Sequence, residues 1–356
     1  MKERIERLQA ALPEGIDAAL ITAQVNRRYY TGFPSSAGTL LVTRGSCTFF
    51  IDFRYYEAAQ RTITGCEVVL QGKLAQQLQE AAAKNGVQTV GIETGYTTVE
   101  QVARFKEMLP SVTLLEDNRL NNLILAQRRI KSEDEIQKIL AAQQLSEQAL
   151  EKLLPSIKAG KTERELALEL EYTTLKLGSQ RAAFDFIVVG GPNSALPHGV
   201  PGDRPLQKGD LITFDFGSVV DGYCSDMTRT LALGQPAGKG AEIYGIVLRA
   251  QLAALEAVGP GVCCADVDKV ARDIIEQAGY GPRFGHNLGH GLGLEVHEAP
   301  SFGQANQELC QPGMVMSVEP GIYLAGCCGC RIEDLVVVTE QGMRNLNRFP
   351  KELMVL

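Results

Sequence analysis

The chain has 356 residues and a net charge of -7, with 22% charged and 45% apolar residues. This composition is typical of a folded globular protein, and the length predicts two domains. The acidic balance argues against nucleic-acid and membrane binding, because both depend on clustered lysine and arginine. The nine cysteines are an odd number, and charges near the N-terminus interrupt any export signal. We therefore expect reduced thiols and a cytoplasmic protein.

The first 125 or so residues alternate between strand-like and helical apolar patterns, which predicts an α/β domain. The expected strands cover residues 17–22, 39–43, 47–52, 66–70, 89–93 and 111–115, and the expected helices cover residues 55–61, 74–84 and 99–109. No glycine fingerprint follows the first strand, so we expect no dinucleotide site here.

A longer helix is predicted after Ser132, because Ser132 and Glu135 have the spacing of a capping box. This change in pattern marks the domain boundary, with predicted domains at residues 1–126 and 127–356. The same signal recurs at Thr162 and Glu165 before a helix that should end near Gly178, and further helices are expected at residues 242–258 and 266–278.

Two strand-like segments, residues 211–218 and 223–231, flank the dipeptide Asp221-Gly222, which is a strong hairpin signal. A two-residue turn there sets a register in which Asp215 and Asp226 lie on one face as diagonal neighbours. Their backbones would be roughly 7 to 8 Å apart. Two like charges at this distance repel each other unless a positive group lies between them.

A second pair of strand-like segments, residues 314–320 and 331–338, places Glu319 and Glu333 in otherwise apolar runs. Arg331 should share a face with Glu333, because side chains alternate along a strand. A single acid on a strand usually faces solvent. Four acids in two hairpins near a group of histidines favour a functional site instead.

Three of the four histidines, His286, His290 and His297, lie within twelve residues among several glycines. Glycine allows the backbone to approach a ligand closely. His286 and His290 have the spacing of a helical zinc protease, but Asn287 occupies the position of the required glutamate. The glycines also disfavour a helix, so this alternative is rejected.

The four acids and one histidine, for which we select His290, exceed the three or so protein ligands of a catalytic zinc ion. They suit two divalent cations roughly 3.5 to 4 Å apart, and the oxygen-rich ligand set favours manganese, cobalt or zinc over copper. Such a pair lowers the pKa of a shared water towards about 7. The chemistry indicated is metal-assisted hydrolysis.

Five short segments carry a more specific pattern: residues 215–217, 225–230, 286–298, 318–323 and 331–334. With these motifs the sequence resembles the pita-bread-fold metallopeptidases, in particular the aminopeptidase P and Xaa-Pro dipeptidase (prolidase) group. The resemblance extends to residues 129–136 and, more weakly, into the first domain. It implies an α/β N-terminal domain followed by an α+β pita-bread catalytic domain.

The resemblance also implies roles for individual residues. The implied ligands of two metal ions are Asp215, Asp226, His290, Glu319 and Glu333, with Asp226 and Glu333 bridging. The implied catalytic residues are His198, His297 and Glu319, and the implied substrate-binding residues are His286 and Arg331. The cysteines Cys327, Cys328 and Cys330 depart from the family pattern, in which small or apolar residues are expected.

The implied activity is hydrolysis of the bond between an N-terminal residue and proline, in small peptides with proline at the second position. A homodimer is implied as well. The sequence does not separate aminopeptidase P from dipeptidase specificity. The alternatives are a methionine-aminopeptidase-like or creatinase-like hydrolase and a non-catalytic peptide-binding module. The first domain argues against the first of these, and the complete ligand set argues against the other two.

Overall fold

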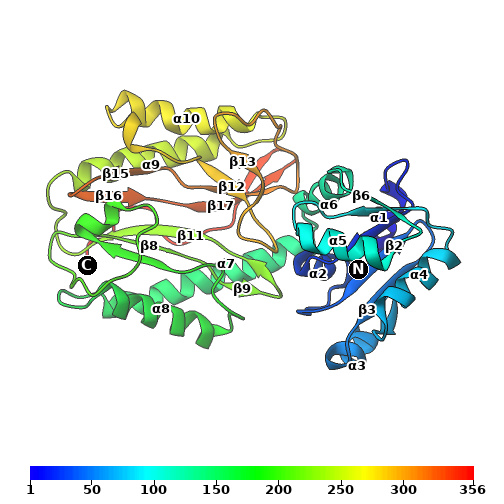
Figure 1. Cartoon of the computed structure of the whole chain (residues 1–356). Helices are drawn as coiled ribbons and strands as arrows, with labels where there is room; N and C mark the ends of the chain where they lie inside the picture. Colours follow the sequence, from blue (N-terminus) through cyan, green and yellow to red (C-terminus); the bar gives the residue numbers. More distant parts are fainter. The chain divides into compact units, whose positions relative to one another are not determined.

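The computed structural model describes residues 1–356, which form two compact units, Met1–Arg128 and Arg129–Leu356 (Figure 1). None of the helices combines the length and apolar character that a membrane crossing requires.

The first unit is built on a six-stranded mixed sheet with the strand order β4-β3-β2-β1-β5-β6. Its strands are β1 (Ala18–Ile21), β2 (Thr39–Thr43), β3 (Cys47–Ile51), β4 (Glu67–Leu70), β5 (Thr89–Ile92) and β6 (Thr113–Leu115). Its helices are α1 (Lys2–Ala11), α2 (Gln24–Thr31), α3 (Phe53–Thr62), α4 (Leu74–Lys84), α5 (Val99–Met108) and α6 (Arg119–Arg129). All six predicted strands and all three predicted helices are confirmed, whereas α1, α2 and α6 were not predicted.

Helix α2 illustrates why sequence reasoning missed a helix. Its N-cap residue is Ala23, which has no side-chain acceptor to satisfy the first amides. Glu93 supplies the missing acceptor from beyond β5, accepting hydrogen bonds from the backbone of Thr22 at 2.6 Å and of Ala23 at 2.9 Å. The start of α2 is thus fixed by a carboxylate some 70 residues away in the chain.

The second unit contains the four predicted helices, α7 (Glu133–Leu153), α8 (Glu163–Leu177), α9 (Gly240–Ala257) and α10 (Cys264–Gln277). Both capping boxes are present, and α8 ends at Gly178 in the left-handed conformation with φ 112°. Three short 3-10 helices complete the helical structure: η1 (Leu154–Ser156), η2 (Gly191–Ala195) and η3 (Gly281–Arg283).

The strands of this unit form two main sheets. The three-stranded sheet has the order β11-β8-β7, with β7 (Ile187–Gly190), β8 (Leu211–Phe216) and β11 (Met227–Ala232). The five-stranded sheet has the order β13-β12-β14-β17-β18, with β12 (Gly289–Gly291), β13 (Glu298–Phe302), β14 (Val315–Val318), β17 (Asp334–Thr339) and β18 (Gly342–Asn345). Two short ladders accompany them: β9 (Val219–Val220) with β10 (Tyr223–Cys224), and β15 (Gly321–Leu324) with β16 (Cys328–Arg331).

Each main sheet has its own apolar core against a different helix pair. Residues of α7 and α8 pack on β7 and β8, and residues of α9 and α10 pack on β14 and β17. Figure 1 shows the strands of this unit lying between the two helix pairs. One face of each sheet is therefore covered by helices. The other face of each sheet, turned away from its helices, is free for polar residues.

The predicted turn at Asp221-Gly222 is confirmed, since Val220 lies opposite Tyr223. The hairpin is interrupted between the β9–β10 and β8–β11 ladders, next to Asp226. At this interruption Gly217 lies so close to the facing strand that an added Cβ would be 2.0 Å from the carbonyl oxygen of Ser225. Only glycine fits there.

The second hairpin corrects an expectation, because residues 314–320 and 331–338 are not continuous strands. One ladder pairs Val318 with Asp334, and the next pairs Gly321 with Arg331. Glu319 and Glu333 lie in the interruption between these ladders. A proline follows Glu319 and cannot donate a ladder hydrogen bond, which accounts for the break. Acidic residues therefore lie where the backbone pairing of both hairpins is broken.

Candidate metal centre and active site

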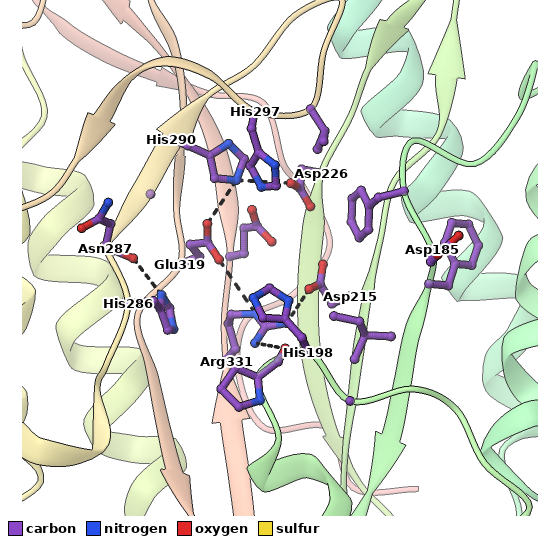
Figure 2. Close-up of a pocket in the computed structure, with 18 of the residues that line it drawn as sticks. Asp185, His198, Asp215, Asp226, His286, Asn287, His290, His297, Glu319 and Arg331 are labelled. Atoms are coloured by element: carbon purple, nitrogen blue, oxygen red, sulfur yellow. Dashed lines mark hydrogen bonds and ion pairs between the residues drawn. The ribbon is translucent and has the colours of Figure 1, made fainter.

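A cavity of about 730 Å³ in the second unit is lined by all nine residues selected from the sequence: His198, Asp215, Asp226, His286, His290, His297, Glu319, Arg331 and Glu333 (Figure 2). They come from both hairpins, from β12 and the segment before it, from the segment before β13 and from the loop after η2. The fold thus gathers side chains that are up to 135 residues apart in sequence, His198 and Glu333 being the most distant.

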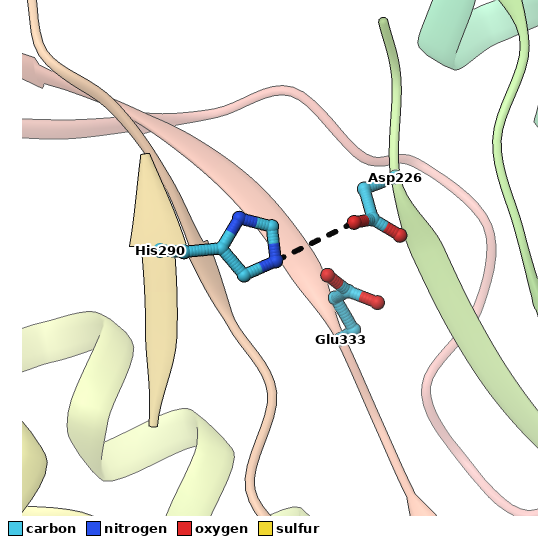
Figure 3. Close-up of side chains that lie close together, drawn as sticks. All are labelled: Asp226, His290 and Glu333. Carbon is cyan, nitrogen blue, oxygen red and sulfur yellow. Dashed lines mark ion pairs between the residues drawn. The ribbon is translucent and has the colours of Figure 1, made fainter. Parts of the chain in front are cut away.

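The tightest group is Asp226, His290 and Glu333, whose potential ligand atoms all lie within 4.8 Å of one another (Figure 3). The His290 Nε2 atom lies 3.5 Å from Asp226 Oδ2. The other ring nitrogen, Nδ1, faces the carbonyl oxygen of Gly291 at 3.1 Å. A proton on Nδ1 satisfies that contact and leaves the Nε2 lone pair directed at the carboxylates, which is the tautomer that a metal-binding histidine needs.

Glu319 joins this group through His290 and Ser317. Its Oε1 atom lies 3.3 Å from His290 Nε2 and accepts a hydrogen bond of 3.1 Å from the hydroxyl of Ser317. The same hydroxyl accepts the backbone N–H of His290 at 2.9 Å. Ser317 thereby fixes β12 and Glu319 relative to each other. Sequence reasoning missed Ser317, although a lone polar residue in a buried apolar strand was the available signal.

Asp215 and Glu333 are connected through Arg331 and Thr228. Arg331 forms an ion pair with Asp215 through Nη2 and donates from Nε to the Thr228 hydroxyl at 3.1 Å. That hydroxyl donates to Glu333 Oε2 at 2.8 Å. Glu333 is 1% exposed, and its other oxygen, Oε1, is buried without a hydrogen-bond partner. Thr228 was a further residue that sequence reasoning did not single out.

The electrostatics of the group favour a bound cation. Burial raises the pKa of Asp226, and the charge of Glu333 raises it further. Burial likewise raises the pKa of Glu333, reinforced by Glu319 and Asp215. Burial also opposes ionisation of Glu319, but the His290 hydrogen bond and nearby positive charge outweigh it and lower its pKa. Buried carboxylates that repel one another, with an orphan oxygen among them, have the donor chemistry of a divalent metal site.

A second chain of hydrogen bonds runs along the wall of the cavity. Arg331 Nη1 donates to the Tyr323 hydroxyl at 2.7 Å, and this hydroxyl lies 2.9 Å from His286 Nε2. His286 Nδ1 faces the carbonyl oxygen of Asn287 at 2.7 Å. Burial lowers the pKa of His286, so the ring is neutral, donates from Nδ1 and accepts the tyrosine proton at Nε2.

The other two histidines lie at the mouth of the cavity. The His297 ring is edge-to-face with that of His290, with ring centroids 4.4 Å apart. Burial lowers the pKa of His297, and the neighbouring His290 lowers it further. His198 is exposed on the loop that follows η2, directly after Pro197, whose carbonyl oxygen accepts a hydrogen bond of 3.3 Å from Arg331 Nη1.

A buried ion pair braces the β12–β13 hairpin, which carries His290 and His297. Lys131 Nζ lies 3.0 Å from Glu298 Oε2, and the two side chains are only 2% and 6% exposed. Glu298 Oε1 also accepts the backbone N–H of Glu295 at 3.2 Å. His297 and Glu298 are adjacent, so the brace fixes the backbone from which the His297 ring extends.

The fold and this cavity define a metallopeptidase with a pita-bread catalytic domain and a creatinase-type N-terminal domain, as the resemblance in the sequence implied. The model of the metallopeptidase family M24 matches residues 137–340, and that of the creatinase/prolidase N-terminal domain matches residues 4–130. The chain belongs to the metallopeptidase family M24, and this membership implies a divalent metal.

Similar proteins extend over the whole chain. A Xaa-Pro dipeptidase from Pyrococcus furiosus is 38% identical over 356 residues, covering 99% of this chain and 100% of the relative. The structure of a Xaa-Pro dipeptidase from Bacillus anthracis matches with a TM-score of 0.96 and 39% identity over 99% of both chains. That of an X-Pro aminopeptidase from Thermotoga maritima matches with a TM-score of 0.92 and 37% identity, over 99% of this chain and 100% of the other.

Proposed function

We propose that this metallopeptidase hydrolyses the peptide bond between an N-terminal residue and a following proline. The observation that carries the proposal is the cluster of Asp226, His290 and Glu333, whose ligand atoms lie within 4.8 Å of one another in the cavity. The names of the similar proteins, which include Xaa-Pro dipeptidases and an X-Pro aminopeptidase, supply the proposed specificity.

Five residues of the cavity would hold two divalent metal ions, of which manganese is proposed first, with cobalt or zinc as alternatives: Asp215, Asp226, His290, Glu319 and Glu333. Asp226 and Glu333 are the proposed bridging ligands, and the unpartnered Oε1 of Glu333 supports this assignment. When bound, the metals supply an activated water at neutral pH and positive charge for the scissile carbonyl.

Glu319 is the proposed proton acceptor. Despite its burial, contacts with His290 and the charge of Arg331 keep its pKa low, so it is ionised and able to accept the proton of the attacking water. Ser317 holds its Oε1 atom in place. The departing proline nitrogen needs a proton donor instead, because it carries no N–H in the peptide and has to gain a proton.

His297 and His198 are the proposed donors to the carbonyl oxygen and to the leaving proline nitrogen. Burial lowers the pKa of His297, so its ring is neutral and carries one N–H group that can donate a hydrogen bond. A neutral ring donates a hydrogen bond but does not give up its proton, so the departing nitrogen would gain the proton that Glu319 has accepted from the water. General acid and base catalysis of this kind contributes about 10² to 10⁴-fold to a rate.

Arg331 and His286 are the proposed substrate-binding residues. Both line the cavity, and the Tyr323 hydroxyl connects them. Arg331 is 4% exposed and supplies the fixed positive charge of this wall, which would attract a peptide carboxylate. A contact with the carboxylate of the proline residue would favour dipeptides, and without it longer peptides would also bind. The proposal therefore includes both dipeptidase and aminopeptidase specificity.

The proposed organisation assigns residues 1–126 to the N-terminal domain and residues 127–356 to the catalytic domain. The homodimer and the cytoplasmic location remain predictions from the sequence. Sedimentation of the purified protein would test the dimer.

The test of function is a substrate panel after chelation and reconstitution with manganese, cobalt or zinc. Ala-Pro and Ala-Pro-Ala should be cleaved and Ala-Ala should not. The ratio of the first two rates distinguishes dipeptidase from aminopeptidase specificity. Asp226→Ala should abolish cleavage, while the matched control Asp203→Ala, which removes an exposed partner of Arg164, should leave it intact. Equal cleavage of Ala-Ala and Ala-Pro would contradict the proposed specificity.

A further inference from the structure

Several of the nine cysteines lie close to another cysteine, although each thiol is free. The close pairs are Cys47 with Cys66, Cys264 with Cys310, and Cys327 with Cys328. The second pair is buried throughout, and the third joins neighbours in sequence, where a disulfide would close a very small ring. The first pair alone combines a half-buried thiol, a buried partner and a separation of 19 residues.

Cys47 and Cys66 occupy facing positions on two neighbouring strands of the first unit. Cys47 begins β3, and Cys66 directly precedes β4. The parallel register pairs Thr48 with Glu67, so one step back places the two cysteines opposite each other. Neighbouring strands are about 4.7–4.9 Å apart, within the 4.4–6.8 Å that the Cα atoms of a disulfide span. The Sγ atoms are 2.9 Å apart.

The backbone around both thiols is fixed. Gly65 precedes Cys66 with φ +81°, and a Cβ there would be 2.9 Å from the Lys2 side chain, so this turn packs against α1. Ile63 is 7% exposed and anchors the same segment in the core. On the other strand, Cys47 pairs with Val42 of β2 inside the sheet. The thiols therefore face each other without any rearrangement of the chain.

We propose that Cys47 and Cys66 form a site of reversible thiol–disulfide exchange that takes low-molecular-weight disulfides as oxidants. The half-buried Cys66, as thiolate, attacks the oxidant and releases one small thiolate, leaving a mixed disulfide on Cys66. Cys47 then attacks the Cys66 sulfur, gives up its proton and releases the second small thiol. The protein loses two electrons and two protons, and the oxidant is reduced to two thiols.

The order of the two steps follows from accessibility. Cys47 is 7% exposed and Cys66 is half-buried, so a small disulfide reaches Cys66 first. The hydrogen bond between the thiols raises the pKa of Cys47, and its burial raises it further. A protonated, buried thiol is a poor initial nucleophile but is well placed to resolve a mixed disulfide 2.9 Å away.

Disulfide formation would act on the edge of the sheet. β4 is the edge strand, all four of its residues are at least partly exposed, and α3 buries only Ala59. A bond from Cys47 to Cys66 closes a covalent ring that includes α3. The ring reduces the conformational entropy of the β3–α3–β4 segment in its locally unfolded state, so local unfolding becomes less favourable. Hydrogen exchange in Glu67–Leu70 should slow roughly tenfold or more on oxidation.

The experiment treats the folded full-length chain with glutathione disulfide, blocks free thiols, and identifies linked peptides by mass spectrometry without reduction. The expected product links Cys47 to Cys66 and reverts with reduced glutathione. The buried, isolated Cys224 should remain a thiol. Cys47→Ser should retain glutathione on Cys66, Cys66→Ser should leave Cys47 unmodified, and the control Cys263→Ser should form the link as the wild type does.

Two results would overturn the proposal. One is a wild-type chain in which Cys66 stays unmodified or keeps glutathione instead of linking to Cys47. The other is a link that forms only under denaturing conditions, which would mean that the folded strands hold the thiols apart. Neither result depends on whether the protein cleaves Xaa-Pro peptides.

Discussion

Lys131→Met removes one partner of the buried ion pair with Glu298, whose side chains are 2% and 6% exposed. The Glu298 carboxylate then loses the ammonium group of Lys131, and removing one partner of a buried ion pair costs about 3–5 kcal/mol. A transition temperature moves by about 2–4 °C per kcal/mol for a domain of this size, so calorimetry should show a decrease of roughly 6–20 °C. Because the hairpin carries His290 and His297, kcat of the folded fraction should fall as well.

The matched control is Lys138→Met. Its ion pair with Asp134 is more open to solvent, with side chains 25% and 69% accessible, so the substitution should change stability by less than about 1 kcal/mol. The double substitution Lys131→Met with Glu298→Met exchanges the whole pair for apolar groups and should recover part of the loss, because Glu298 also accepts the backbone N–H of Glu295. A Lys131→Met protein within about 1 kcal/mol of the wild type, by urea unfolding, would show that this ion pair does not stabilise the hairpin.

Three further changes test other parts of the structure. Gly217→Ala places a Cβ 2.0 Å from the facing carbonyl oxygen and should destabilise by several kcal/mol in urea unfolding, about 3 or more, whereas Gly285→Ala meets no atom within 4 Å and should be neutral. Thr228→Val removes the hydroxyl that donates to a buried carboxylate of the cluster, so manganese affinity measured by calorimetry should fall about 10 to 100-fold, and an unchanged affinity would contradict this role. The backbone N–H of Gln88 has the largest effect in lowering the pKa of Asp17 below its unfolded value, and other hydrogen bonds add to it. The ionised Asp17 therefore stabilises the fold above about pH 4, and this stabilisation is lost as the pH falls through the lower pKa of the folded state. The urea midpoints of wild type and Asp17→Asn should therefore converge on acidification, and a constant difference would exclude this linkage.

Local signals in the sequence predicted the features that depend on a few adjacent residues. Ser132 with Glu135 identified the start of α7, because both partners of the capping box are three residues apart. The turn at Asp221-Gly222 set the register of the first hairpin for the same reason.

Features that depend on distant partners were not predicted. Helix α2 begins where Glu93 reaches back to Ala23, and no residue near Ala23 signals this contact. The interruptions of both hairpins were also missed, since the alternating pattern continues through Glu319 and Glu333 while the backbone pairing does not. The ladders break at Glu319 and Glu333, and both acids line the cavity.

The candidate site was largely accessible to sequence reasoning because its acids and histidines are unusual in glycine-rich or apolar surroundings. The residues that position them were not. Ser317, Thr228 and Tyr323 look like ordinary strand residues, and only their hydrogen bonds to Glu319, Glu333 and His286 reveal their contribution.

We propose that two divalent ions lie among five side chains of this chain. Anomalous diffraction at the manganese edge, from crystals of the chelated and manganese-reconstituted protein, tests it most directly. We expect two peaks roughly 3.5 to 4 Å apart, with Asp226 and Glu333 between them. No peak in this cavity, or a single peak at saturating manganese, would contradict it.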